Sequence, residues 1–594
     1  MEANIVRMVQ DRAVKYKNRE VFRFKNKQTK NYDSITWDEF WLNVKATGRS
    51  LLSMGCGNGA MVGIMSDNMP CWTIADLGIL SARGVVVPLY ATSSKGQIKY
   101  IVDQTGMKLL FVGSQKHLEN AIWALDNTES LKKVVVFEKG VKMEDERCLT
   151  WADFLLLGSK PEYDEELKQS IDAIKNDDLA TILYTSGTTG EPKGVMLGHD
   201  NFTQCFSIHD RRLQVDESDI SFCFLPLSHV FERAWTYYML YKGAVNAFLE
   251  NTKEVIDDIR LVKPTVMCTV PRFFEKTYEG IQHEMQKWPV LKRKIFNWSI
   301  CVGYRVSEYR GNGQPLPMGI KIRRVIANAL VFTKIKKIFG GQIRFFPCAG
   351  AAIINQHLRF FHAAEVFINY GYGATETTAT VSCYRTDKYD LNTCGTIMPE
   401  VEVRFTDEDE ILVKGKTIFK GYYKNPQATE SILVDGWYKS GDKGYLSSGG
   451  DLIMTDRIND IFKTSVGKFI SPQKVEMALL ADPFIDQVVV LGDNRKYICA
   501  LIVPSIEKLR TVWKIEGIDE YSSSDLLNHT QIVSFMEQRI EQCQKDFPPY
   551  EKVVKFKLLA EPFSIQNGEL THTLKIRRRL IEERYRDMVE EMYA

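Results

Sequence analysis

No run of 18 consecutive apolar residues occurs in this sequence, although 44% of its 594 residues are hydrophobic. A helix that crosses a bilayer needs a run of about that length, so we expect no transmembrane segment. The first twenty residues lack the apolar centre of a secretory signal, and no low-complexity block or internal repeat is present. Because 594 residues exceed what one hydrophobic core requires, we expect two or more domains.

Paired cysteines are also lacking. The 12 cysteines stand singly, without a C-x-x-C pair and without histidines at metal-ligand spacing. This pattern is typical of reduced, cytoplasmic proteins without a zinc site. A large charge of one sign is missing too, since 77 Lys and Arg are balanced by 75 Asp and Glu. The balance therefore gives no argument for nucleic acid as a partner.

What the sequence does contain is a regular alternation of helical and strand patterns. Thr36 and Glu39 have capping-box spacing ahead of an apolar-periodic stretch. Two buried strands are predicted at 61–66 and 85–90, with a helix at 71–84 between them. This β-α-β order predicts parallel sheets covered by helices.

The pattern changes near residue 456, where shorter strands at 487–492 and 497–504 flank a turn and helical segments follow. We therefore predict an α/β chain of two domains. The larger domain, residues 1–455, would hold helix-covered, parallel-rich sheets. The smaller domain, residues 456–594, would be α+β.

One loop, YTSGTTGEPKGVML at 184–197, places four hydroxyls and three glycines close to Lys193. Such a run is either an ordinary turn or a phosphate cradle, in which backbone N–H groups approach an anion. It lacks the G-x-x-x-x-G-K-[ST] spacing of P-loop NTPases, which disfavours that class. The strand predicted at 179–183 puts the loop at the edge of a sheet.

This loop resembles the phosphate-binding motif of the adenylate-forming enzymes, which include acyl-CoA synthetases, peptide-synthetase adenylation domains and luciferases. Segments at 224–238 and 270–281, with the long insertion before residue 340, resemble the long-chain fatty-acid–CoA ligases in particular. The ordered matches make the resemblance specific. Four further motifs of the superfamily follow the loop in order: GYGATETT (371–378), YKSGDKGYL (438–446), DRINDIFKTSVGKFISPQKVE (456–476) and NGELTHTLKIRRR (567–579).

The resemblance implies a ligase that works in two steps with ATP, Mg²⁺ and CoA. A fatty-acid carboxylate attacks the α-phosphate of ATP, which gives acyl-AMP and pyrophosphate, and the thiol of CoA then displaces AMP. It also implies that the C-terminal domain is mobile between the two steps. Because two anions meet in the first step, the site must supply positive charge and positioning.

For the phosphates, the resemblance implies that Lys193 and the N–H groups of the loop hold the β- and γ-phosphates, and that Thr375 donates to a phosphate. Glu376, together with Thr185, would hold Mg²⁺, a cation that prefers oxygen ligands. The loop residues concerned are Thr185, Ser186, Gly187, Thr188, Thr189 and Gly190.

For the nucleoside, Tyr372, followed by Gly373, would offer the face of its ring to adenine. Asp442 would accept hydrogen bonds from both ribose hydroxyls, and Arg457 would contact the ribose and orient the second domain. Taken alone, such residues are more often turn or surface residues, so these roles rest on the resemblance. A wall of small residues on the other side of adenine would consist of Gly350, Ala351 and Ala352.

The implied catalytic residues are Lys575, Glu376, Lys193 and His229. The ammonium of Lys575 would lie beside the α-phosphate and the acyl carboxylate during adenylation only, where it offsets the repulsion between two anions. His229 would line the same position, although a lone histidine on an apolar stretch also suits a core. We do not predict it as a general base, because a carboxylate nucleophile has no proton to remove.

Two residues depart from the pattern of the family. Asn459 occupies the hinge position two residues after Arg457, where Asp or Lys is usual, and asparagine tolerates the backbone angles that a hinge needs. His572 replaces a proline in the loop before Lys575, which should leave that loop looser.

The insertion at 287–344 is strongly basic, with thirteen Lys and Arg and a single acidic residue, Glu308. Two interpretations stay open. The first is peripheral contact with anionic lipid at the inner face of a membrane. The second is a core helix with a solvated basic side, because the apolar stripe of Ile322, Val325 and Ile326 loses its register within two turns.

Two other functions also stay open. A sister enzyme, either an acyl–carrier-protein ligase or a fatty-acyl-AMP ligase, would keep the same ATP motifs. An inactive lipid- or nucleotide-binding protein is disfavoured, since it would not need the charged residues that the chain retains. These residues are Lys193, Glu376, Asp442, Arg457 and Lys575.

Overall fold

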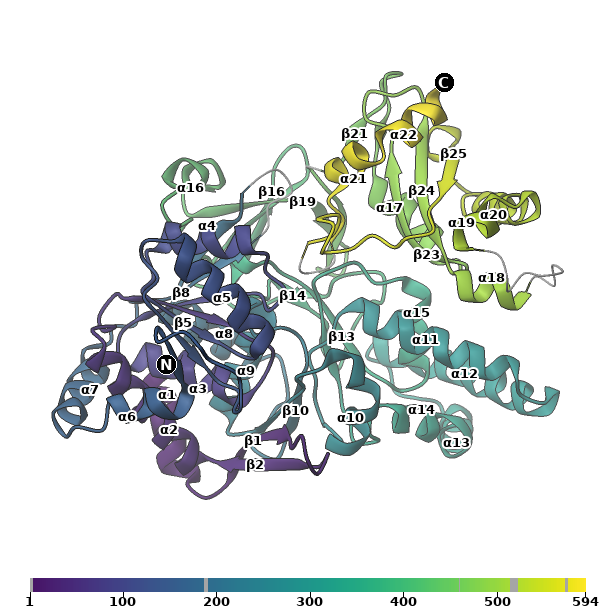
Figure 1. Ribbon diagram of the computed structural model, residues 1–594. Coiled ribbons are helices and arrows are strands. Elements are labelled where there is room, and N and C mark those ends of the chain that lie inside the picture. Colours follow the sequence, from purple (N-terminus) through teal and green to yellow (C-terminus); the bar gives the residue numbers. More distant parts are fainter. Residues whose placement is uncertain (1–3, 186–190, 459, 513–521, 572–574) are drawn as a thin grey trace.

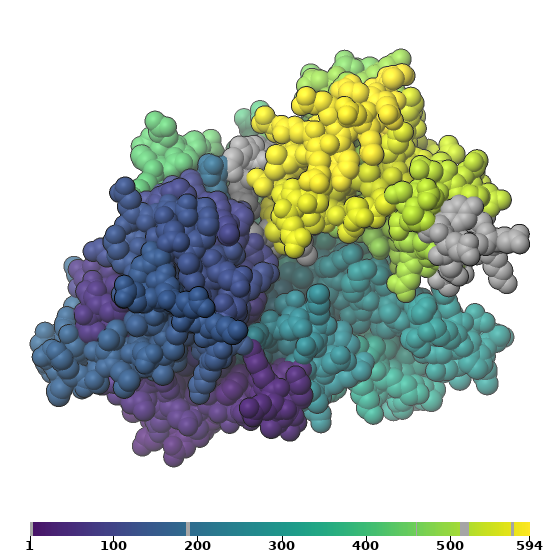
Figure 2. Space-filling view, in the orientation of Figure 1, coloured from purple at the N-terminus to yellow at the C-terminus, as the bar shows by residue number. Residues whose placement is uncertain are grey.

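The computed structural model describes residues 4–185, 191–458, 460–512, 522–571 and 575–594. A large N-terminal body carries a smaller C-terminal domain on one of its faces (Figures 1 and 2). Helices and strands alternate through the first half of the body, which confirms the predicted α/β class.

The largest sheet has seven strands and confirms the β-α-β prediction. Six neighbouring strands run parallel, and β9 at the edge is antiparallel to β8. This last pair places Thr185 opposite Lys193, so both ends of the glycine-rich loop leave the same sheet edge. The spatial order is β7 (Cys148–Thr150), β6 (Lys133–Val136), β5 (Leu109–Val112), β3 (Met61–Met65), β4 (Val85–Leu89), β8 (Leu179–Thr185) and β9 (Lys193–Gly198).

Helices cover both faces of this sheet. The apolar sides of α4 and α5 pack on one face. On the other face α2 and α3 share a core with α1 and α9. The capping box at the start of α2 is confirmed, since Thr36 and Glu39 each accept a hydrogen bond from the other's backbone N–H. The bounds are α1 (Ile5–Tyr16), α2 (Trp37–Ser53), α3 (Pro70–Ser81), α4 (Lys95–Thr105), α5 (Gln115–Asn127) and α9 (Val230–Lys242).

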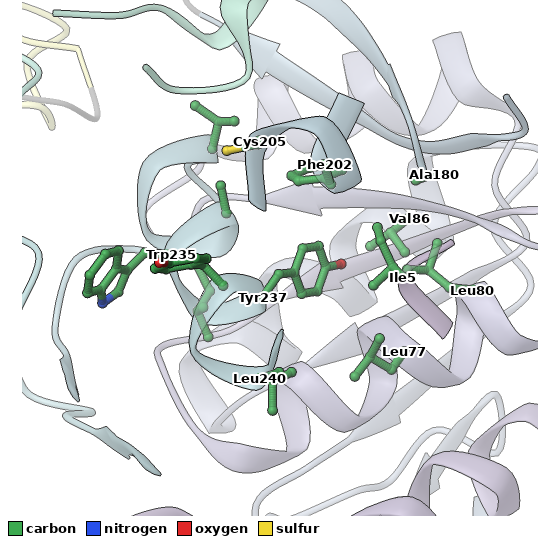
Figure 3. Close-up of a cluster of buried hydrophobic side chains, with 14 of the residues drawn as sticks. Ile5, Leu77, Leu80, Val86, Ala180, Phe202, Cys205, Trp235, Tyr237 and Leu240 are labelled. Atoms are coloured by element: carbon green, nitrogen blue, oxygen red, sulfur yellow. The ribbon is translucent and has the colours of Figure 1, made fainter. Parts of the chain in front are cut away.

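Helix α9 connects this core with the candidate site. The Tyr237 hydroxyl donates a 2.6 Å hydrogen bond to Asp76, and the same carboxylate forms a fully buried ion pair with Arg233. Trp235 points away from Tyr237 (Figure 3), because residues two apart on a helix do not share a face. A buried pair strongly opposes the loss of either partner, so it holds α9 and α3 together.

Two four-stranded sheets continue the body. In the second of them, β12 and β13 run parallel, with Cys348 opposite Tyr370, so the segments after both strands leave from one edge. The stretch 265–269 bridges the two sheets through Val266 and Thr269. The strands are β10 (Ile220–Cys223), β11 (Val245–Phe248), β1 (Glu20–Lys25) and β2 (Tyr32–Thr36), then β12 (Phe346–Cys348), β13 (Ile368–Tyr372), β14 (Ser382–Cys383) and β15 (Thr396–Ile397).

A five-stranded antiparallel sheet ends the body. Its strand β20 pairs with β19 and ends at Arg457, two residues past the predicted boundary at 455/456. The pairing sets Asp442 opposite Arg457. The strands are β16 (Glu402–Phe405), β17 (Glu410–Lys414), β18 (Leu433–Val434), β19 (Trp437–Leu446) and β20 (Leu452–Arg457).

The C-terminal domain has its own core around the sheet β23-β24-β25, and it includes the two strands predicted on either side of a turn. Asn494 in that turn has a φ of 57°, which asparagine tolerates. Helices and a short hairpin surround the sheet. The elements are β21 (Phe462–Lys463), β22 (Phe469–Ile470), α17 (Pro472–Leu480), β23 (Ile485–Leu491), β24 (Ile498–Pro504), α20 (Thr530–Cys543), β25 (Val553–Leu558), α21 (Arg578–Arg584) and α22 (Arg586–Tyr593).

The basic insertion forms helices α12 (Val290–Gly311), α13 (Met318–Ala327) and α14 (Thr333–Ile338). The interpretation of its apolar stripe as the inner face of a core helix is wrong, because Ile322, Val325 and Ile326 are 57%, 65% and 46% exposed. Among the described helices, none combines the length and the apolar character that crossing a membrane requires.

Candidate active site

Asp442 is the centre of a hydrogen-bonded group at the edge of the β19–β20 pair. Its Oδ2 accepts a 2.7 Å bond from the Tyr372 hydroxyl, and its Oδ1 lies 3.0 Å from Nε of Arg457. Asp442 and Tyr372 are 4% and 8% exposed. Burial raises the pKa of Tyr372, and the Asp442 carboxylate raises it further, so the phenol stays a donor at neutral pH. The sequence motifs at 371–378 and 438–446 therefore meet in space.

The segment after β13 turns sharply at Gly373. A Cβ on Gly373 would lie 1.5 Å from the carbonyl oxygen of Ala379, so only glycine fits there. The 3₁₀ turn Thr375–Thr377 follows and carries Glu376, whose side chain is half-buried. Thr375 is buried, at 8% exposure. The sequence motif thus forms a tight turn that presents Glu376 beside the end of β13.

Tyr422 is a site residue that the sequence analysis missed. Its hydroxyl donates a 2.8 Å hydrogen bond to Oε1 of Glu376. The ammonium of Lys193 lies 5.1 Å from the centre of the same ring. Tyr422 reaches this position because it bridges to Val195 on β9, two residues after Lys193. No local pattern around Tyr422 distinguishes it from other tyrosines.

Lys575 comes from the C-terminal domain, yet it acts electrostatically on residues of the body. Its side chain keeps access to solvent but is crowded by protein atoms, and this loss of hydration lowers its pKa to about 8. The charge of Arg457 lowers the pKa further, whereas the carboxylates of Asp442 and Glu376 oppose the shift. Lys575 therefore lies within electrostatic reach of the predicted ribose and magnesium residues.

His229 lies at the N-terminus of α9, where its Nδ1 accepts a 3.2 Å hydrogen bond from the N–H of Phe231. Burial lowers its pKa to about 4, and the charge of Lys575 contributes. A neutral ring whose Nδ1 accepts carries its proton on Nε2. The Nε2–H of His229 is therefore a hydrogen-bond donor, within electrostatic reach of Lys575.

The remaining predicted residues divide into two groups. Gly350, Ala351 and Ala352 are exposed and follow β12, beside the end of β13 that carries Tyr372. Thr185 ends β8, and its hydroxyl lies 3.5 Å from the carbonyl oxygen of Lys193. Outside the described residues lie Ser186, Gly187, Thr188, Thr189, Gly190, Asn459 and His572.

A cavity of about 30 Å³ opens directly beside Tyr372. Its wall is mainly apolar and aromatic, with Phe231 and Trp235 from α9 and with Cys348 at the end of β12. Polar residues of the wall include Asn369 and a pair in which Nε2 of His209 lies 3.0 Å from Oγ1 of Thr380. The arrangement offers space for an apolar group next to the residues around Asp442.

The residues around Glu376 suit a magnesium ion that is bound largely by its nucleotide. In the described chain no cluster of three or more His, Cys, Asp or Glu side chains could hold a metal by itself. Oε1 of Glu376 is held by Tyr422, which orients the carboxylate. Mg²⁺ commonly takes one or two carboxylates and completes its shell with phosphates and water.

Comparisons with known proteins agree with this geometry. Residues 9–423 match the AMP-binding enzyme family, and residues 459–594 match the AMP-binding enzyme C-terminal domain. A long-chain-fatty-acid–CoA ligase of Mycobacterium bovis, FadD15, is 30% identical over 95% of this chain and 92% of its own. Long chain acyl-CoA synthetase 3 of Arabidopsis thaliana is 30% identical over 94% of this chain and 86% of its own.

Solved structures share the fold. The adenylation domain of a carboxylate reductase from Mycobacterium chelonae superposes with a TM-score of 0.77, at 20% identity, over 99% of this chain and 91% of that one. The anthranilate CoA ligase AuaEII, solved with anthranoyl-AMP, superposes with a TM-score of 0.73 at 16% identity, over 99% of this chain and 98% of that one. Since the family match alone spans well over half of the chain, this protein belongs to the AMP-binding, adenylate-forming enzymes.

Proposed function

We propose that this enzyme activates a long-chain fatty acid with ATP and transfers the acyl group to CoA. The observation that carries the proposal is the apolar cavity beside Tyr372, which adjoins the group formed by Tyr372, Asp442 and Arg457. An acyl chain in the cavity would present its carboxylate near Lys575 and His229. The relatives named above, a long-chain-fatty-acid–CoA ligase and a long chain acyl-CoA synthetase, support the same substrate class.

In the first step the acyl carboxylate attacks the α-phosphorus of ATP, and the bond to the bridging oxygen of pyrophosphate breaks. Lys575 would neutralise charge on the two anions as they approach, and the Nε2–H of His229 would donate to one of them. Such preorganised donors act most strongly where charge develops in the transition state. Asp442 would accept from the ribose hydroxyls while Tyr372 and Arg457 hold its carboxylate.

A bound Mg²⁺ would offset negative charge on the phosphates. Glu376 would hold it, oriented by Tyr422, and Lys193 would contribute a cation on the same side. In the second step the thiol sulfur of CoA forms a bond to the acyl carbon, and AMP leaves. Lys575 would withdraw with its domain between the two steps, as the predicted hinge at Asn459 implies.

The size of the cavity limits the length of the acyl chain that it could hold without rearrangement. A volume of about 30 Å³ holds little more than one water, so lining side chains would have to rearrange before a long chain can enter. Each methylene that is then buried should add about 0.8 kcal/mol to binding. We therefore expect the specificity constant to rise from acetate through octanoate to palmitate.

Pyrophosphate release with ATP and each of these acids tests the proposal. A rise with chain length is expected, and equal or better use of acetate would exclude the long-chain assignment. Offering CoA or a carrier protein to the preformed adenylate distinguishes the acceptors. Release of pyrophosphate without any thioester product would instead indicate a fatty-acyl-AMP ligase.

A further inference from the structure

Exposed apolar side chains gather on the basic insertion. Met318, Ile322 and Val325 of α13 are 71%, 57% and 65% exposed, and Leu291 of α12 is 70% exposed. Both helices lie at the lower right of Figure 1. A soluble surface carries single exposed apolar residues as a rule, whereas several on one face of a helix mark an interaction site.

These residues form faces rather than scattered points. Met318, Ile322 and Val325 are spaced i, i+4 and i+7, and Leu291, Ile295 and Trp298 repeat that spacing on α12. The core uses other residues, since α12 packs inward through residues such as Phe296 and Ile300, and α13 buries only Ala327. The exposed faces are therefore not needed to hold the two helices in place.

Free positive charge flanks both apolar faces at Lys294 and Lys321, which lie three residues after Leu291 and Met318. Arg293, Lys294, Lys321 and Arg323 are exposed and form no ion pair with a described residue. Other cations of the insertion are occupied, since Arg310, Arg324 and Lys336 converge on the buried carboxylate of Glu365. The basic charge thus divides into a structural part, fixed on Glu365, and an outward part beside the apolar faces.

We propose that the outer faces of α12 and α13 dock on an anionic lipid bilayer. The apolar side chains would enter the boundary between headgroups and acyl chains, and the outward cations would pair with anionic headgroups. A second copy of the chain suits this surface less well, because a symmetric contact would bring two sets of like charges together. The proposal does not depend on the reaction that the enzyme catalyses.

Co-sedimentation of the full chain with vesicles tests it. We expect binding to vesicles of three parts phosphatidylcholine and one part phosphatidylserine, and not to phosphatidylcholine alone. A triple variant, Met318→Ser with Ile322→Ser and Val325→Ser, should weaken binding about tenfold or more. The charge variant Lys294→Glu with Lys321→Glu should do the same, and raising the salt to about 1 M, where the Debye length is about 3 Å, should release the wild type.

Matched controls change exposed residues elsewhere on the body. Lys132→Glu with Lys168→Glu, and Leu156→Ser at a side chain that is 67% exposed, should bind like the wild type. Unaltered binding in both insertion variants, or equal loss in the controls, overturns the proposal. The proposal is also overturned if the wild type does not bind the vesicles but forms a dimer that the triple variant abolishes. The surface would then be occupied by a second copy of the chain. Circular dichroism verifies that each variant is folded.

Discussion

Tyr422 donates a 2.8 Å hydrogen bond to Oε1 of Glu376 while its ring lies 5.1 Å from the ammonium of Lys193. One side chain thus touches both the carboxylate proposed to hold Mg²⁺ and the cation proposed to hold phosphate. The hydroxyl and the ring face act on different partners, so the two contacts can be separated by substitution.

Tyr422→Phe keeps the ring beside Lys193 and removes the hydrogen bond to Glu376. Residues that orient a metal ligand commonly contribute about 10- to 100-fold to metal affinity or activity. We expect the Mg²⁺ concentration for half-maximal adenylation to rise about tenfold, measured by ATP–pyrophosphate exchange. Tyr445→Phe, at a side chain that is 51% exposed, is the control. An unchanged magnesium dependence would show that Tyr422 does not orient the ligand.

Lys575→Ala should impair adenylation and spare thioester formation. The ammonium would act only while it lies near Glu376 and Asp442, as it does in this arrangement of the domains. Removing one preorganised donor typically costs about 10²–10³ in rate. Pyrophosphate release measures the first step, and thioester formation from supplied acyl-AMP and CoA measures the second. Lys545→Ala, an exposed residue of the same domain, is the control. Equal losses in both steps would contradict the proposed alternation.

The pKa of Lys575 predicts a pH dependence. Loss of hydration lowers that pKa to about 8 in the free enzyme, so the ammonium loses its proton as the pH rises through that value. The kcat/KM for adenylation should therefore fall above about pH 8, since this parameter reports the ionisations of the free enzyme. Lys575→Arg retains its charge there and should lose this descending limb. A limb that persists in the arginine variant would belong to another group.

Glu232 predicts a pH-dependent stability. It is fully buried in α9, its Oε2 accepts a 3.2 Å bond from the N–H of Leu225, and burial raises its pKa to about 8. Between about pH 4.5 and 8 the folded state then holds one more proton than the unfolded state. The contribution of Glu232 to the free energy of unfolding therefore falls as the pH rises, by up to about 1.4 kcal/mol per pH unit.

Glu232→Gln removes this titration. Oε1 of Glu232 has no hydrogen-bond partner among the described residues, so nothing there awaits the new amide group. We therefore expect the substitution to lower the free energy of unfolding by an amount that does not depend on pH. The free energy of unfolding in urea, measured for both proteins from about pH 5 to about pH 8, should shift steadily in favour of the variant. Parallel pH profiles would show that Glu232 is ionised in the folded protein.

The local sequence was sufficient for several elements. Met61–Met65 and Val85–Leu89 lie in short apolar runs that predict buried strands, and Thr36 with Glu39 caps a helix by contacts three residues apart. Alternating strands and helices then require a helix-covered parallel sheet. The ordered motifs identified the family because each carries its ligand groups within a few consecutive residues.

Other features were decided by contacts between distant segments. Tyr422 contacts both Glu376 and Lys193 only because a bridge to Val195 sets it against β9. No sequence pattern near Tyr422 predicts that contact. The exposure of Ile322 and Val325 was likewise not readable, since an apolar stripe has the same spacing whether it faces a core or solvent. Periodicity therefore determined which residues share a face of a helix. Whether that face is covered by other segments or exposed to solvent depends on their packing, which only the tertiary structure decided.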